Sequence, residues 1–515
     1  MVNFVRKHDK LTCWILGIIL VLSLIPVFII SGYDAAAGDD YNFGASSHLI
    51  FLQTGSILAA IKAAWQTSAS TWYSWQGTWF DCFVFCLHPE VFSDSAYVIV
   101  PYIFLTLHII GFLTFAHHFL KVRWQIEGFY WLQVGLLFLI FEFQLMPSPK
   151  NGIFWWVGCV HYIMPLFMAL IGIVLGDRFL LTHRIRDLVG LFVVSALMGG
   201  ATYPAALLLP IAVFLIWLAE FVLGGKRDKK DFLLLIPFAA LMVGLVISAI
   251  APGNANRAAS DLKNGATPAG GPVATIIESF RLSVVEGAGS FVLERGFILI
   301  ALMAVLVLTL AAFRTVGKEN AEKVSSFAKA FSHPLLFMLV MFCVNASVYA
   351  PRAYSGGVVS FGYYDFNFLT FFTCLVAAEI YVLGWLFFCK GLFVKGAETR
   401  GAKILLNCGF VVLALVIAFL SKHGVKQYTD YVCMQYYLSG QADDYKEQIA
   451  LQRRLLEGDE AEVCLPGINN EQGPLMHMPV VEDPDNIDNY MTAKFYGKAK
   501  IWAIPRSEWM ELYGE

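Results

Sequence analysis

Long apolar runs recur along the whole chain, and they constrain its fold more than any other feature. Each is about 20 residues long, the length a helix needs to cross a hydrocarbon core of roughly 30 Å. Within lipid the backbone must satisfy its own hydrogen bonds, so such runs form helices. Hydrophobic residues make up 58% of the chain, charged residues only 15%, and the mean hydropathy is +0.64, values that exclude a soluble domain. We therefore predict an all-α polytopic membrane bundle with about eleven transmembrane helices, near residues 11–31, 95–118, 127–146, 156–178, 187–202, 204–223, 231–251, 295–313, 333–350, 366–389 and 403–421.

Region 187–223 leaves two interpretations open. Gly199, Gly200 and Pro204 mark either a tight turn between two helices or a kink in one long helix. The first span is simpler, because it follows a charged head and no small-residue cleavage site precedes Tyr33. We interpret it as an uncleaved transmembrane helix.

The distribution of Lys and Arg predicts the orientation of the bundle. With the N-terminus inside, the inner segments carry about three times as many Lys and Arg as the outer loops. This bias places the N-terminus in the cytoplasm and, for an odd number of spans, the C-terminus outside. The outer loops between spans hold only Lys62, Lys150, Arg257, Lys263, Arg281, Arg295 and Arg352.

Three outer segments are long enough to hold a functional site, namely 32–94, 252–294 and the tail. We predict a transmembrane domain over residues 1–421 and a small extracytoplasmic α/β appendage over 422–515, because hydrophobic runs stop at Lys422 and charged, Pro and Asn residues appear. Within the tail we expect a helix from Tyr445 to Leu456, a short strand from Val463 to Leu465, and a loop over 479–489.

An acidic pair, Asp39 and Asp40, follows the first span directly. Carboxylates at the membrane surface can bind a hard divalent cation or accept a proton from an incoming hydroxyl. The pair is therefore a candidate catalytic centre with Mg²⁺ or Mn²⁺ as an optional ligand. The alternative is a solvated polar loop.

Aromatic residues crowd the segment after this pair. Trp72, Trp75 and Trp79 fall within ten residues of one another, and Tyr41 adjoins the acidic pair. Aromatic faces suit the C–H faces of sugar rings, and Trp and Tyr also form belts at membrane interfaces. Both interpretations hold if amphipathic helices lie along the membrane beside the site.

Four short elements of the chain resemble a known group. They are Asp39-Asp40-Tyr41, Trp75-Gln76-Gly77, Ala251-Pro252-Gly253-Asn254 with Arg257, and the segment from Asn489 to Gly497. With the long first outer loop they resemble the GT-C superfamily of membrane glycosyltransferases. More narrowly, they resemble bacterial serotype-converting (O-antigen) glucosyltransferases and enzymes that add side-chain sugars to cell-wall polysaccharides. In that family the Trp-x-Gly element usually continues with Arg, whereas Thr78 follows it here.

The resemblance implies inverting transfer of a sugar from a polyprenyl phosphate to a hydroxyl of a cell-surface glycan, at the outer face of a bacterial inner membrane. Asp39 or Asp40 then acts as general base on the acceptor, and the other orients the acceptor or holds a metal. The partners implied are the lipid-linked donor, the glycan acceptor and membrane lipid. No basic stripe points to nucleic acid, and the net charge is only −3.

A donor phosphate needs cations, so the few outer arginines become informative. Arg257 and Arg352 rank first because both follow helix exits at headgroup depth, and Arg281 and Arg295 flank segment 274–292, a candidate re-entrant segment. The alternative for each is an interface anchor. His161 lies where an outer cavity is expected and is a candidate acceptor-binding residue.

Other classes of protein remain open at this point. A transporter or flippase of lipid-linked or small polar substrates, a polysaccharide polymerase or ligase, and a scaffold without catalytic activity are the alternatives. The ten cysteines show no metal-ligand spacing. The pairs Cys82 with Cys86 and Cys433 with Cys464 are either disulfides or free thiols.

Overall fold

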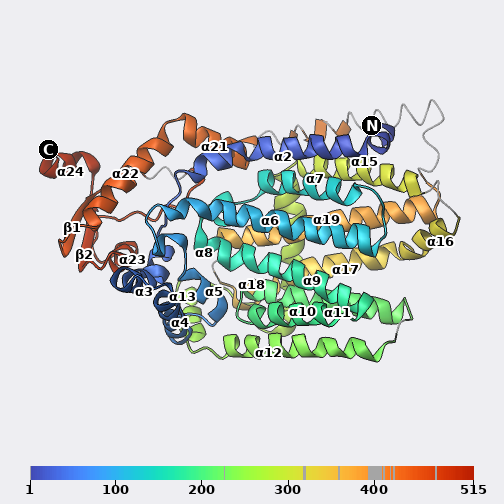
Figure 1. Ribbon diagram of the computed structural model, residues 1–515, viewed down its shortest axis with the longest axis horizontal. Helices are drawn as coiled ribbons and strands as arrows, with labels where there is room; N and C mark the ends of the chain where they lie inside the picture. The colour runs from blue at the N-terminus through green and yellow to red at the C-terminus, as the bar shows by residue number, and fades with distance from the viewer. Residues whose placement is uncertain are drawn as a thin grey trace.

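The computed structural model describes residues 2–514 except 226, 317–320, 358–359, 393–408, 410–411, 414, 418, 421–423 and 470–472. Most helices run lengthwise through one elongated bundle (Figure 1). These lengthwise helices are α2 (Asp9–Ser31), α6 (Val100–Ala116), α7 (Tyr130–Leu145), α9 (Met164–Thr182), α10 (Ile185–Met198), α11 (Tyr203–Val222), α12 (Leu235–Ala249), α15 (Ile298–Val316), α17 (Pro334–Ser347) and α19 (Phe361–Gly384).

Shorter helical turns extend several of these helices without a break in direction. They are η2 (Ala96–Ile99) and η3 (His117–Arg123) on α6, α8 (Trp156–Gly158) and η5 (Cys159–Ile163) before α9, η6 (Lys229–Leu234) before α12, and η8 (Trp385–Cys389) after α19. With these extensions, seven helices in the described part of the chain are long and apolar enough to cross a membrane. An eighth span results if α16 (Ala321–Ala330) and α17, bent by 47°, are counted as one.

The prediction of a helical, multi-pass membrane protein is therefore confirmed, while the number eleven stays a prediction. Segments 127–146 and 187–202 form helices of only 16 and 14 residues, shorter than the roughly 20 residues that a perpendicular crossing needs. Most of segment 403–421 lies outside the described residues.

Residues 199–202 settle the open question about region 187–223. They form a turn between α10 and α11, so the region contains two helices. Gly199 lies against the backbone of Gly244 in α12, where a Cβ atom would collide. Its lack of a side chain lets α10 and α12 approach closely, as small residues do in membrane bundles.

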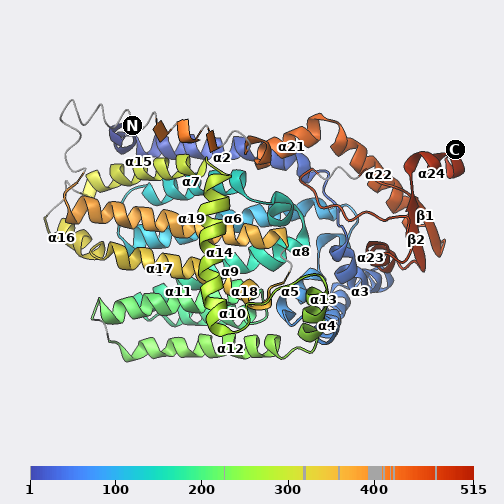
Figure 2. The ribbon, with the colours of Figure 1, turned by 180° about the vertical axis from the view of Figure 1, so that it is seen from behind.

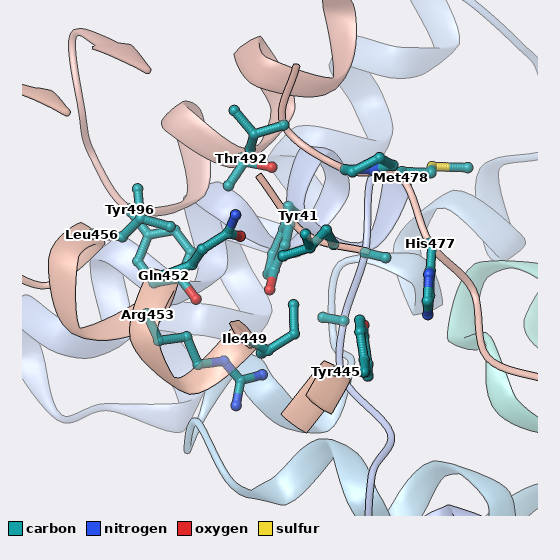
Figure 3. Close-up of a pocket in the computed structure, with 15 residues that line it drawn as sticks. Tyr41, Tyr445, Ile449, Gln452, Arg453, Leu456, His477, Met478, Thr492 and Tyr496 are labelled. Carbon is teal, nitrogen blue, oxygen red and sulfur yellow. The ribbon is translucent and has the colours of Figure 1, made fainter. Parts of the chain in front are cut away.

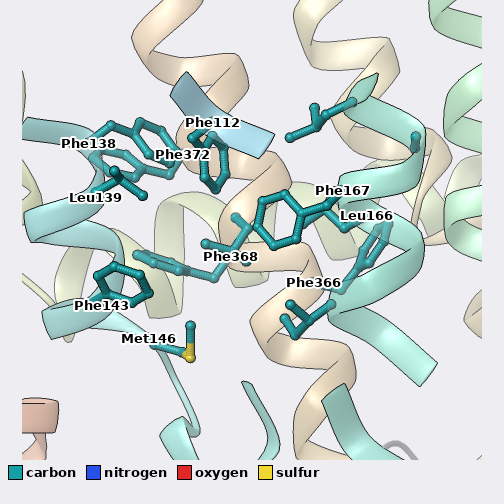
Figure 4. Close-up of a cluster of buried hydrophobic side chains, with 14 of the residues drawn as sticks. Phe112, Phe138, Leu139, Phe143, Met146, Leu166, Phe167, Phe366, Phe368 and Phe372 are labelled. Atoms are coloured by element: carbon teal, nitrogen blue, oxygen red, sulfur yellow. The ribbon is translucent and has the colours of Figure 1, made fainter. Parts of the chain in front are cut away.

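Phenylalanine side chains fill the middle of the bundle (Figure 4). The ring centroids of Phe112 and Phe138 are 4.3 Å apart, and those of Phe138 and Phe372 are 4.5 Å apart. These rings come from α6, α7 and α19, and Phe167 of α9 packs edge-on against Phe112. The close ring contacts supply the van der Waals packing that holds helices together in lipid.

Shorter helices gather at one end of the bundle, which we call the site end (Figure 1). The N-terminal helix α1 (Val2–Lys7) and α16 lie at the opposite end. The elements at the site end are α3 (Asp39–Thr54), α4 (Ile57–Ser74), α5 (Trp79–Phe85), η1 (Pro89–Val91), η4 (Lys150–Phe154), α13 (Gly253–Lys263) and α18 (Ala350–Ser355).

Helix α14 (Pro272–Leu282) and its continuation η7 (Ser283–Val292) run across the spans rather than along them (Figure 2). The exposed side of this segment carries Val273, Ile276 and Ile277. The candidate re-entrant segment is thus an apolar-faced helix on the flank of the bundle.

The tail combines helices with one parallel pair of strands at the site end. Strands β1 (Glu462–Pro466) and β2 (Lys500–Ile504) pair with Val463 opposite Ile501. The predicted helix and strand of the tail appear as α22 and β1, whereas the loop predicted over 479–489 ends at Asn486, directly before α23 begins. The helices of the tail are η9 (Val425–Gln427), α21 (Thr429–Leu438), α22 (Gln441–Leu456), α23 (Ile487–Phe495) and α24 (Arg506–Tyr513).

Candidate functional site

Two of the sequence elements, Trp75–Gly77 and Ala251–Asn254, dock against each other at the site end. The side-chain oxygen of Asn254 accepts a hydrogen bond from the amide of Gly77 at 3.0 Å, and its amide group donates to the carbonyl of Ser248 at 2.8 Å. A Cβ atom on Gly253 would collide with the backbone of Trp75. These backbones can meet only because Gly253 has no side chain.

This docking places Arg257, one turn into α13, beside the Trp75–Gln76 backbone. Its guanidinium donates to the side-chain oxygen of Gln76 and lies 5.9 Å from the centre of the Trp75 ring. Arg257 is half-buried, and within the described part of the chain it forms no ion pair with a carboxylate. A half-buried guanidinium with neutral partners is well suited to bind an anion.

The two acidic residues have different surroundings, although they are neighbours in sequence. Asp40 is fully buried, and both its oxygens accept hydrogen bonds: Oδ2 from Tyr97 Oη at 2.5 Å and from the amide of Ala37 at 3.2 Å, and Oδ1 from the amide of Val157 at 3.1 Å. Burial raises the pKa of Asp40 to about 8, against the effect of these donors. Asp40 therefore fixes the start of α3 to its surroundings and offers no surface to a substrate.

Asp39 is half-buried and makes no hydrogen bond among the described residues. Burial raises the pKa of this carboxyl, the negative charge of Asp488 raises it further, and the positive charge of Arg257 opposes both. Asp39 thus lies within electrostatic reach of Arg257 and of α23 in the tail. A carboxylate with a raised pKa is a stronger base than an ordinary aspartate.

A cavity of about 470 Å³ lies between α3 and α4, next to this group. Ligand cavities usually measure about 300–1,000 Å³. Its lining consists mainly of neutral polar side chains, with two aromatic rings and one cation from the tail. The lining residues are Asn42, Phe43, Ser46, Ala63, Gln66, Thr67, Ser70, Thr71, Ser74, Trp75 and Lys494. We call it the α3–α4 groove. Asp39 precedes Asn42 and Phe43 by one turn and shares their face of α3.

A histidine with a buried carboxylate partner adjoins Arg257. His161 Nδ1 lies 2.8 Å from Asp81 Oδ2, and the Asp81 side chain is fully buried in α5. Burial raises the pKa of Asp81 well above its ordinary value. A carboxylate in this position orients the imidazole and leaves Nε2 available. The charge of Arg257 also reaches His161, so the sequence-predicted residues Asp39, Arg257, Trp75 and His161 belong to one neighbourhood.

The other three arginines predicted for the donor phosphate lie elsewhere, and two of them pair with carboxylates. Arg352 forms an ion pair with Glu286 of η7 and lies 5.7 Å from the ring centres of Tyr363 and Tyr364. Arg281 is exposed and pairs with Glu278 one turn earlier, at 2.6 Å. Arg295 is buried, and burial lowers its pKa.

The other predicted sugar-binding residues serve mainly as packing groups. Tyr41 is buried against Phe495 of the tail, with ring centroids 4.8 Å apart. Trp72 donates from Nε1 to the carbonyl of Ile247 at 2.9 Å, and Trp79 packs against Gly200. Only Trp75 of the four aromatic residues lines the groove.

The acidic pair does not fit a two-carboxylate metal site, because Asp40 already accepts three protein donors and is inaccessible. Among the described residues, no group of three or more His, Cys, Asp or Glu side chains is arranged to hold a metal ion. Cys82, Cys86, Cys433 and Cys464 are free thiols.

An ion pair between half-buried Arg453 and buried Glu90 joins the tail to the first loop, and Figure 3 shows Arg453 among the residues that line the adjoining cavity. Arg453 Nη2 of α22 lies 2.7 Å from Glu90 Oε1, and Arg453 Nη1 donates to the carbonyl of Asp94 at 3.0 Å. A cavity of only about 30 Å³ remains at this seam, enough for a water molecule but not for a sugar.

Lys494 is the charged residue of the cavity lining, and sequence reasoning did not single it out, although it lies within the quoted Asn489–Gly497 element. Asp81 was missed as well, because nothing in the sequence pairs it with His161 across 80 positions. Comparison of the chain with protein-family models, curated proteins and solved structures gives no match.

Proposed function

We propose that this chain is an inverting glycosyltransferase that moves a sugar from a polyprenyl phosphate to a hydroxyl of a cell-surface glycan. The observation that carries the proposal is the meeting of a base, Asp39, and an uncompensated cation, Arg257, beside a groove lined by hydroxyls, amides and aromatic rings. Hydroxyl and amide groups hydrogen-bond sugars, aromatic faces cover their C–H faces, and Arg binds phosphate with a two-pronged fork.

The two faces of helix α4 support the proposal that the donor is lipid-linked. Its face away from the bundle exposes Ile57, Leu58, Ile61 and Trp65, while its other face lines the groove. A helix with this division lies in the headgroup zone, with the apolar side toward acyl chains. A polyprenyl chain can then remain in the membrane while its phosphate reaches Arg257.

The transfer step balances with these groups alone. The acceptor oxygen attacks C1 of the donor sugar, the bond between C1 and the phosphate oxygen breaks, and the polyprenyl phosphate leaves with its electron pair. Asp39 takes the proton of the acceptor hydroxyl, and Arg257 stabilises the charge that grows on the phosphate. No step depends on a metal ion.

We place this site on the extracytoplasmic side of a bacterial inner membrane. The excess of Lys and Arg in the segments predicted to lie inside supports this orientation. The phenylalanine packing in the middle of the bundle supports an enzyme over a transporter, because a transported substrate needs a polar path there.

The role of Arg257 is tested by its replacement with Lys, which keeps the charge and loses the fork. Loss of a charge-assisted contact removes about 1.5–3 kcal/mol, so we expect the apparent KM for the donor to rise about ten- to hundredfold. Initial rates are measured with purified protein and a synthetic polyprenyl-phosphate sugar. Lys62→Arg, on the exposed face of α4, is the control and should leave the donor KM unchanged. An unchanged donor KM in Arg257→Lys would mean that Arg257 is only an anchor.

The pH dependence of transfer tests the surroundings of Asp39. The base must be ionised, and its raised pKa places the acid limb of the rate profile above that of an ordinary aspartate. Asp488→Asn removes a negative charge that raises this pKa, so the acid limb should move to lower pH. Asp485→Asn, an exposed change in the preceding loop, should leave the profile unchanged. A shift to higher pH in Asp488→Asn would contradict the assignment of Asp39 as base.

A further inference from the structure

A second uncompensated cation, Lys494, reaches the α3–α4 groove from the tail. Its ammonium donates to the carbonyl and to the side-chain oxygen of Asn42, at 3.0 and 2.9 Å. Both acceptors are neutral, and Lys494 forms no ion pair within the described ranges of the chain. A half-buried ammonium without a counter-charge is costly unless a ligand supplies one. Lys494 lines the groove, so such a ligand has access to it.

The two cations lie at different places along the site. Arg257 acts electrostatically on Cys82 of α5, and Lys494 acts on Cys86, the residue that directly follows α5; four residues of helix correspond to a rise of about 6 Å. Figure 1 places α13, which carries Arg257, beside the ends of the spans, and α23, which carries Lys494, on the side of α3 away from them. In the orientation proposed above, we expect Arg257 to lie near headgroup depth and Lys494 to lie farther from the membrane.

This separation points to two different anions. The phosphate of a lipid-linked donor must stay close to the membrane, which suits Arg257. The groove between α3 and α4 offers neutral polar side chains for sugar hydroxyls along its length, with Lys494 at its wall. A saccharide that enters from the aqueous side meets Lys494.

We propose that the α3–α4 groove binds an acceptor saccharide that carries a phosphate or carboxylate group, and that Lys494 pairs with that anion. The inference rests on the proposed function, because it calls the saccharide an acceptor. It adds the chemical class of the acceptor and makes the tail part of the binding site. Lys494 binds substrate and takes no part in proton transfer.

Binding measurements on the full-length protein in nanodiscs test this proposal without any transfer reaction. The probes are matched pairs, each a neutral sugar and its 6-phosphate, for glucose, galactose and mannose. Binding of each probe is measured by saturation-transfer NMR. Within each pair only the charge differs, so the ratio of affinities separates charge from sugar stereochemistry. We expect the protein to bind at least one 6-phosphate about fivefold or more tightly than its neutral partner.

Variants identify the cation that is responsible. Lys494→Gln should abolish the preference, Lys494→Arg should retain most of it, and Arg257→Gln should leave it in place. Lys62→Gln is the matched control, because Lys62 is an exposed lysine of α4 that does not line the groove. Loss of the preference in Arg257→Gln but not in Lys494→Gln would assign the anion to the donor phosphate and overturn the proposal. Equal binding of every pair by the unmodified protein would also overturn it, even if no variant folds.

Transfer assays separate the two proposals. If the enzyme transfers sugar, Lys494→Gln should raise the KM for a phosphorylated acceptor about fivefold or more and leave the donor KM unchanged, and a rise in the donor KM alone would overturn the acceptor assignment. The protein could instead bind sugar phosphates selectively through Lys494 but transfer no sugar. That result would contradict the proposed function and still support the anion site.

Discussion

Asp39→Asn should reduce sugar transfer by about 10²–10⁴-fold, the usual contribution of a general base. Asn has the size of Asp but cannot take a proton from the acceptor hydroxyl. Because Asp39 is half-buried and makes no hydrogen bond among the described residues, the change should leave stability and donor binding nearly intact. The measurements are the transfer rate at saturating donor and the melting temperature of the purified variant.

Asp40→Asn should behave in the opposite way. The single Asn oxygen can still accept from Tyr97 Oη and from the amide of Ala37, but the NH₂ group then faces the amide of Val157. An unsatisfied buried donor costs about 1–3 kcal/mol, so this variant should melt at lower temperature. Asp459→Asn, an exposed change in the tail, should alter neither rate nor stability. Near-normal transfer by Asp39→Asn would remove Asp39 as base and make His161, with its partner Asp81, the next candidate.

Arg453→Ala should release the tail from the bundle and abolish transfer. It leaves Glu90 fully buried without its partner, and loss of one member of a buried ion pair costs about 3–5 kcal/mol. The tail carries Lys494 to the groove and the charge of Asp488 within reach of Asp39, so its release also dismantles the site. Limited proteolysis should cut residues 424–514 faster in this variant, and the transfer rate should fall in parallel.

The neighbouring residue provides a matched control for this prediction. Arg454 is exposed, so Arg454→Ala removes the same side chain one position along α22 and should alter neither proteolysis nor transfer. Arg506→Ala breaks an exposed ion pair with Asp444, which is worth at most about 1 kcal/mol. Equal proteolysis of Arg453→Ala and Arg454→Ala would show that the Glu90 contact does not hold the tail.

The membrane-spanning nature of the chain follows from its sequence. Apolar runs as long as Leu11–Ile30 can only be helices in lipid, and the structure describes them as such. The sequence also predicts α22 and β1 of the tail, because both patterns consist of neighbouring residues. The number of membrane spans is harder to predict from the sequence, because a helix of 14 residues such as α10 differs little in composition from a membrane-spanning helix.

The sequence also singled out Asp39 and Arg257, because charges are scarce next to the predicted helix exits. It could not separate Asp39 from Asp40. That difference arises from Tyr97 and from the amides of Ala37 and Val157, which come together only when α3, α6 and α8 pack.

Tertiary structure alone decided which charges are available to a substrate. Arg352 and Arg257 look alike in sequence, since both follow a proline at a helix exit. In the fold Arg352 forms an ion pair with Glu286, 66 positions away, whereas Arg257 donates to Gln76, lies beside the Trp75 ring and forms no ion pair among the described residues. Lys494 reaches Asn42 across 452 positions. A pattern of residues reports local spacing, while the partner of a charged side chain depends on contacts between distant segments, which only packing creates.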